Sequence, residues 1–171
     1  MRLIRWLVAI SFVAFSAALL SFSDAQQPIK GKGKGGMDPS QKADMELFHF
    51  LLDHRMEITR SITKRDDGVE SVTESKNPKV AEKIQEHVAS MKKRVEEKRP
   101  IHLRDPLFAA IFKNADKIDF RWEKTAKGAK VLETSKGAYV AKLLQAHAEV
   151  VSLFLKNGHA EVMKNHELPK Q

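Results

Sequence analysis

The chain has 171 residues, with 30 lysines and arginines against 22 aspartates and glutamates, for a net charge of +8. It has no cysteine, which excludes disulfides, a lipid-modified cysteine, attached c-type haem and a copper site built on a thiolate. A basic excess is typical of nucleic-acid-binding proteins. Here the cations are interspersed with glutamates along helical faces, which predicts no nucleic-acid partner. An anionic envelope surface or an acidic partner remains an alternative to a plain solubilising surface.

The first 25 residues are typical of a signal peptide. Arg2 and Arg5 form a positive start, residues 7–20 are almost wholly apolar, and the triplet Ser-Asp-Ala at 23–25 matches a cleavage site. A membrane anchor is the alternative, but the apolar run is shorter than the ~20 residues of a spanning helix. We predict export to the periplasm or the outside, with no membrane span left after cleavage. Residues 26–37, rich in glycine and lysine, predict a disordered linker before a single domain at 38–171.

The domain is predicted to begin with a helix, a β-hairpin and a second helix. Asp38 and Pro39 are typical of a helix start, and the apolar spacing continues to about residue 54. Residues 58–63 alternate, with Ile58, Arg60 and Ile62 on one face, and a turn at 65–68 leads to a return strand at 69–73. A helix from Asn77 to about residue 98 follows. Its apolar stripe consists of Val80, Ile84, His87, Val88, Met91 and Val95.

The second half is predicted to repeat this order. A short helix at 107–112 follows Asp105 and Pro106. Residues 116–124 alternate strongly, with Phe120 and Trp122 on one face, and residues 129–134 return as a strand. A helix at 138–157 ends at Gly158, and a short helix at 159–165 completes the chain.

Residues 45–98 and 105–158 form a tandem duplication, because matching residues such as His87 and His147 recur at a constant offset of 147 − 87 = 60 positions. The matched pairs include Phe48 and Phe108, Ile58 and Ile118, Gly68 and Gly128, Ser75 and Ser135, Val80 and Val140, Gln85 and Gln145, and His87 and His147. A single hairpin with one apolar face is not stable alone. We therefore predict an α+β fold, in which both repeats form one four-stranded antiparallel sheet packed against helices.

The histidines are the candidate site residues. His87 and His147 both fall inside the apolar stripe of a helix, at equivalent places in the two repeats. One interpretation is a pair of structural core histidines with hydrogen-bonded partners. The other is a pair of ligands for haem or a divalent metal, presented by two helices related by a pseudo-twofold axis.

Two further residues are candidate ligands. Met91, one turn after His87, is a candidate third ligand for a cofactor or for copper, or else a core side chain. His54 is a candidate metal ligand, although an imidazole near the end of a helix commonly contacts free carbonyls. We expect the other histidines to be exposed: His49, His102, His159 and His166.

The segments FHFLLDHR, IQEHVASM, DPLF, LLQAHAEVV and NHELP together resemble a group of uncharacterised exported bacterial proteins. The resemblance covers most of the chain after residue 37. It implies a bacterial envelope or secreted setting, and it implies no activity, cofactor or site residues.

The sequence contains no nucleophile elbow, phosphate-binding loop, HExxH pair or EF-hand spacing. We therefore expect a non-enzymatic exported protein that binds a small ligand, with haem or a transition metal such as copper between the two long helices. The alternative is a cofactor-free module that docks a protein of the cell envelope. An enzyme that uses the histidine pair as acid and base is a third hypothesis.

Overall fold

The computed structural model describes residues 38–170 of the chain. The predicted signal peptide at 1–25 and the linker at 26–37 lie outside the described residues. The elements in chain order are α1 (Pro39–Asp53), η1 (Arg55–Glu57), β1 (Ile58–Arg65), β2 (Gly68–Ser75), α2 (Pro78–Glu96), α3 (Pro106–Lys113), η2 (Ala115–Lys117), β3 (Asp119–Thr125), β4 (Gly128–Thr134), α4 (Ala138–Asn157) and α5 (His159–Val162).

All four strands belong to one antiparallel sheet in the order β1–β2–β4–β3. Strand β1 pairs with β2 and β3 pairs with β4 within the two hairpins. The inner strands β2 and β4 pair with each other, with Ser71 opposite Val131. This confirms the predicted α+β fold with a single four-stranded sheet. The elements recur at the offset seen in the sequence: α1 and α3 end at Asp53 and Lys113, and 53 + 60 = 113.

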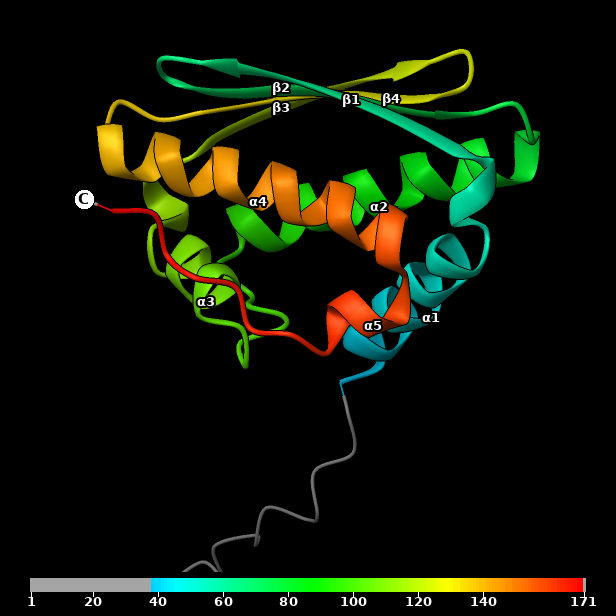
Figure 1. Cartoon of the computed structure of the whole chain (residues 1–171), viewed down its shortest axis with the longest axis horizontal. Coiled ribbons are helices and arrows are strands. Elements are labelled where there is room, and N and C mark those ends of the chain that lie inside the picture. Colours follow the sequence, from blue (N-terminus) through cyan, green and yellow to red (C-terminus); the bar gives the residue numbers. More distant parts are fainter. Residues whose placement is uncertain (1–37, 171) are drawn as a thin grey trace, which may run out of the picture. The chain divides into compact units, whose positions relative to one another are not determined.

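The helices form two layers on one side of the sheet. Figure 1 shows α2 and α4 directly below the strands, with α1, α3 and α5 on their far side. The long helix of each repeat packs mainly on the hairpin of the other repeat. Helix α2 contacts β4 more extensively than β2, and α4 contacts β2 more extensively than β4. The two repeats therefore interlock rather than stack as separate units.

Local sequence signals explain where the helices begin and end. The side chains of Asp38, Asn77 and Asp105 each accept a hydrogen bond from the backbone N–H two residues on, and a proline follows each one. Gly158, with a φ of 63°, ends α4. At the end of α2, Lys98 takes a φ of 52° and the Arg99 N–H bonds the Arg94 carbonyl, so the helix ends at Glu96 rather than near residue 98.

Two other boundaries differ from the prediction. The alternating residues from Asp116 do not all join a strand, since Ala115–Lys117 form a 3₁₀ turn and β3 begins at Asp119. The last helix ends at Val162 instead of Asn165. It stops there because the following segment turns back so that His166 reaches Asp105, the N-terminal cap of α3.

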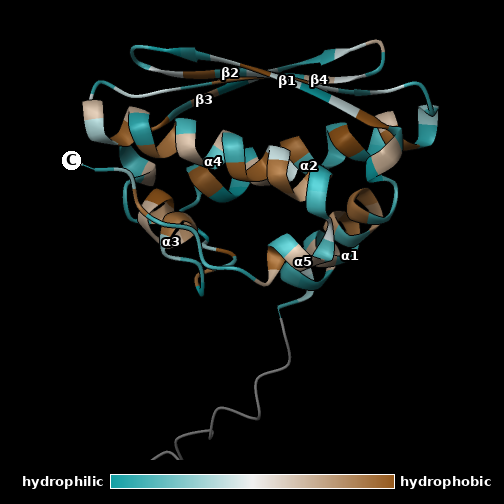
Figure 2. Ribbon diagram, viewed as in Figure 1, coloured by the Kyte–Doolittle hydropathy of each residue, from teal (hydrophilic) through white to brown (hydrophobic). Residues whose placement is uncertain are grey.

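The largest cluster of buried side chains lies between the helical layers and consists of Leu52, Leu107, Ile111, Leu143, Val150 and Phe154. Figure 2 shows α3 as largely apolar, while α2 and α4 carry both apolar and polar residues around their circumference. Among the described helices, α4 has the length and hydropathy of a membrane span. Its buried residues pack against β2 and α3, as expected of the core helix of a folded domain.

Candidate functional site

A cavity of about 600 Å³ lies between the inner face of the sheet and the helices. Most of its lining is aliphatic or aromatic, and it straddles the pseudo-twofold axis, because equivalent residues of both repeats line it. The equivalent pairs are Phe48 and Phe108, Leu51 and Ile111, Leu52 and Phe112, His87 and His147, Met91 and Val151, and Val95 and Leu155. The internal duplication therefore builds one shared cavity rather than two.

His87 on α2 and His147 on α4 both line this cavity and are half-buried. Each ring packs on a phenylalanine of its own repeat: Phe48 is stacked on His87 with centroids 6.1 Å apart, and Phe108 meets His147 edge-on at 5.0 Å. The Nδ1 atom of each imidazole is buried without a hydrogen-bond partner in the described part of the chain. The structure thus brings the predicted pair into one cavity without the hydrogen-bonded partners expected of core histidines.

Both imidazoles are neutral at neutral pH. Burial lowers the pKa of His87 to about 4, with Asp44 opposing this change and Arg60 adding to it. Burial likewise lowers the pKa of His147 to about 4, helped by the charge of Arg60. A neutral imidazole offers one donor and one acceptor, so the pair can bind a ligand without bringing charge into the cavity.

Arg60 on β1 projects into the same cavity. Its Nη1 donates a 2.6 Å hydrogen bond to Thr73 Oγ1, while its Nε is buried without a partner among the described residues. Burial lowers the pKa of Arg60 to about 10, and the negative charge of Glu133 opposes this shift. The guanidinium is therefore cationic at neutral pH inside a largely apolar space.

Glu133 on β4 also lines the cavity. Burial raises its pKa to about 7, although the charge of Arg60 opposes the rise. The two do not form an ion pair, since no guanidinium nitrogen lies within 4.0 Å of the carboxylate. Glu133 consequently exchanges a proton near neutral pH.

These two charges break the symmetry of the duplication. Arg60 faces Thr73 across β1 and β2, and in the second repeat Phe120 faces Glu133 across β3 and β4. Neither Arg60 nor Glu133 was chosen as a site residue from the sequence. The signal was present, because Arg60 occupies the apolar face of its strand between Ile58 and Ile62. A charged residue at an inward strand position is a candidate functional residue.

The other predicted ligands divide between the cavity and the surface. Met91 lines the cavity with His87. His54 is not among the lining residues, and its Nδ1 lies 2.6 Å from Glu57 Oε1 beyond the end of α1. Within residues 38–170, no three histidine, aspartate or glutamate side chains are grouped as a metal site. The set His87, His147 and His54 is therefore not brought together.

The remaining histidines were expected to be exposed, which is wrong for two of them. His166 is 12% exposed, because its two ring nitrogens lie 2.6 Å from Asp105 Oδ2 and 3.2 Å from Glu161 Oε1. His102 is 24% exposed and lines the cavity. His49 and His159 do lie at the surface.

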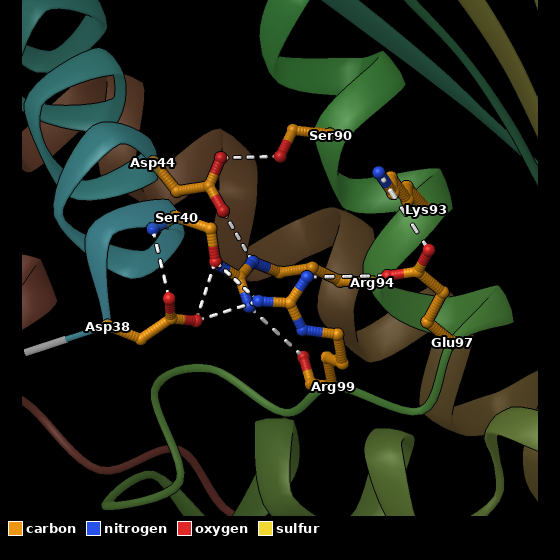
Figure 3. A network of polar contacts seen from close by, with 8 residues as sticks. All are labelled: Asp38, Ser40, Asp44, Ser90, Lys93, Arg94, Glu97 and Arg99. Carbon is orange, nitrogen blue, oxygen red and sulfur yellow. Dashed lines mark hydrogen bonds and ion pairs between the residues drawn. The ribbon is translucent and has the colours of Figure 1, made fainter.

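Asp44, which lines the cavity, belongs to a polar network between α1 and α2 (Figure 3). The Asp44 carboxylate accepts hydrogen bonds from Ser90 Oγ and Arg94 Nε on α2, and Arg94 Nη2 donates to Ser40 Oγ at 3.3 Å. This network ties α1 to α2. The second repeat has Arg104, Val150 and Phe154 at the positions sixty residues further on, and Val150 and Phe154 there belong to the largest apolar cluster.

The opening of the cavity lies at the loop between α2 and α3. Pro100, Ile101, His102 and Leu103 line the cavity, and Leu103 is 53% exposed. His102 has a φ of 58°, a left-handed conformation that is uncommon for residues other than glycine. Met45 on α1, which is 37% exposed, also lines the cavity.

The cavity combines a largely apolar lining with a few polar side chains. Its lining residues include no serine, cysteine or lysine, and the one hydroxyl, on Thr73, accepts a hydrogen bond from Arg60. The polar groups include the Arg60 cation, the Asp44 carboxylate bound to Arg94, the Glu133 carboxyl group that titrates near neutrality, and the neutral imidazoles of His87 and His147. Comparisons with protein-family models, with curated proteins and with solved structures found no match to this chain.

Proposed function

We propose that this chain is an exported, non-enzymatic protein that binds a small, largely apolar molecule in the cavity between the sheet and the helices. The observation that carries this proposal is the cavity of about 600 Å³, in which a few polar side chains converge within an apolar lining. Binding pockets of about 300–1,000 Å³ with this kind of lining are typical of small-molecule sites. Export is supported by the amino-terminal sequence and by the resemblance to exported bacterial proteins.

Haem is a candidate within this class. It combines a large apolar ring with iron that imidazoles bind, and His87 and His147 line the cavity from two different helices. A metal ion alone has less support. The cavity offers two imidazoles and the Met91 thioether, and the buried Nδ1 atoms lack the hydrogen-bonded partner that orients most metal-binding histidines.

The alternative function is a cofactor-free module that docks a protein of the cell envelope. Met56 and Met163, which are 84% and 68% exposed, are apolar side chains available for such a contact. This proposal needs no ligand in the cavity, so the two functions differ in what the purified protein contains.

The test is to purify the exported protein without denaturation and to analyse what it carries. A visible spectrum detects haem, elemental analysis detects a metal, and solvent extraction with mass spectrometry detects an organic ligand. We expect an extractable small molecule or an added ligand that raises the melting temperature by binding the native state. The matched controls are Val88→Trp and Val151→Trp, which fill the cavity from α2 and α4 and should abolish either effect in a folded protein.

Colourless, metal-free protein would contradict the binding function if its melting temperature also failed to respond to apolar ligands. Circular dichroism must show that both cavity-filling variants are folded. The parent protein and these variants can then be compared for bound ligand and for melting temperature. The interaction module would then be the better supported function.

A further inference from the structure

The binding function leaves one charged group in the cavity without a partner of opposite charge. The guanidinium of Arg60 has one short hydrogen bond, to the neutral hydroxyl of Thr73, and its Nε is buried and unpartnered. No carboxylate of the described residues lies within 4.0 Å of it. A buried charge without a counter-charge is costly and commonly marks a site at which a ligand supplies that counter-charge.

The balance of charge around Arg60 is positive at neutral pH. The titratable and charged groups that face this space are Glu133, His87, His147, Asp44, His49 and His102. Asp44 is already bound to Arg94 and Ser90, and the two buried imidazoles are neutral. Glu133, whose pKa burial raises to about 7, is partly protonated. The cavity therefore favours an anion over a cation.

We propose that the ligand is an apolar molecule with a carboxylate group, and that the guanidinium of Arg60 binds this carboxylate. The proposal rests on the binding function above and names the class of its ligand. Arg is suited to this role because its planar donors match the two oxygens of a carboxylate. Fatty acids, aromatic acids and the propionates of haem share this chemistry.

Glu133 gives the site a dependence on pH. An anion beside Arg60 adds negative charge close to Glu133, so binding raises the pKa of that carboxyl group and the complex takes up a proton. Affinity for a carboxylate ligand therefore falls as the pH rises through 7. Glu133→Gln removes this dependence, because the amide does not titrate.

The experiment compares ligands that differ in their polar group, by calorimetric titration of the full exported chain. Dodecanoate, dodecan-1-ol and dodecyltrimethylammonium share one apolar chain, while haemin and its dimethyl ester test the porphyrin source. We expect dodecanoate to bind about 10- to 100-fold more tightly than dodecanol, which is the range for a hydrogen bond to a charged group. Haemin should exceed its ester in the same way if a porphyrin is the ligand.

Three variants test the role of Arg60. Arg60→Gln should bring the affinity for dodecanoate close to the affinity for dodecanol, while Arg60→Lys should keep part of the preference for the carboxylate. The matched control is Arg121→Gln, also on a strand but with a side chain that is 72% exposed, which should bind like the parent protein.

Two results overturn the proposal while leaving the binding function intact. One is equal affinity of the parent protein for dodecanoate and dodecanol. The other is tighter binding of the ammonium compound, which would make Glu133 the group that binds the ligand. If no compound in either series binds, the binding function itself fails.

Discussion

Gln85 and Gln145 make the same two hydrogen bonds, each to the hairpin of the other repeat. Gln85 Nε2 donates to the carbonyls of Thr125 and Gly128 at 3.2 and 3.0 Å. Gln145 Nε2 donates to the carbonyls of Arg65 and Gly68 at 2.8 and 3.2 Å. These equivalent bonds connect α2 and α4 to the opposite hairpins.

Gln85→Ala and Gln145→Ala should destabilise the protein by similar amounts. Each removes two hydrogen bonds to backbone carbonyls, so each should lower the free energy of unfolding by about 1–3 kcal/mol. Chemical denaturation measures the change. Glu82→Ala, at an exposed position of α2, is the control and should stay within about 0.5 kcal/mol of the parent protein. A neutral effect of both glutamine substitutions would show that the crossed packing does not depend on them.

Gly68→Ala and Gly128→Ala should severely destabilise the fold. A Cβ atom at Gly68 would lie 2.0 Å from the carbonyl oxygen of Glu133, and one at Gly128 would lie 2.1 Å from that of Thr73. Both contacts are with backbone of the neighbouring central strand, so β2 and β4 would have to separate. We expect losses of more than about 3 kcal/mol or no folded protein.

The control for the two glycines is Gly137→Ala at the start of α4, where the nearest atom to a new Cβ is 3.6 Å away. Thermal unfolding should show little change for this variant. If Gly68→Ala were equally well tolerated, the close pairing of β2 with β4 would be wrong.

Replacing a cavity histidine should raise the free energy of unfolding, relative to the parent protein, more at acid pH than at neutral pH. The pKa of His147 is about 4 when folded and 6.5 in the reference state, so the unfolded chain binds a proton first as the pH falls below 6.5. Stability is therefore lost between about pH 6.5 and 4, by about 1.4 kcal/mol per pKa unit. His147→Leu removes this loss, and denaturation at pH 5 and pH 8 measures the difference.

Glu133→Gln should change the pH dependence of stability in the opposite direction. The pKa of Glu133 is about 7 when folded against 4.5 in the reference state, so the folded state holds its proton more tightly and loses stability as the pH rises from 4.5 through 7. The substitution should therefore increase the free energy of unfolding more at pH 8 than at pH 5. If both Glu133→Gln and His147→Leu raised the free energy of unfolding more at the same one of these two pH values, the assignment of the two pKa shifts would be contradicted.

His166→Ala should free the C-terminal segment from α3. Burial alone would raise the pKa of Asp105, but hydrogen bonds from His166 and from the Leu107 N–H hold that pKa below its ordinary value. The buried Asp105 carboxylate therefore needs His166 as a partner. We expect a loss of about 1–3 kcal/mol and faster proteolysis after residue 162. His159→Ala, which removes an exposed contact with Asp53, should cost no more than about 1 kcal/mol.

Much of the fold was predictable because its signals are local or repeated. The capping residues Asp38, Asn77 and Asp105, the alternation in the strands and the constant offset between repeats all operate within short stretches of chain. They predict the order of elements and a single sheet. They also place His87 and His147 at inward positions of equivalent helices, because a helical stripe shows which side chains face the core.

The sequence by itself therefore determined the duplication, the order of elements and the inward histidine pair. Only the tertiary structure decided which hairpin each long helix covers, because that choice depends on contacts such as Gln85 with Gly128, between residues far apart in the chain. The tertiary structure brings Arg60 and Glu133, on strands of different repeats, into one cavity with both histidines. The tertiary structure also places His166 against Asp105. The sequence does not predict this contact, because two chain segments so far apart leave no periodic signal.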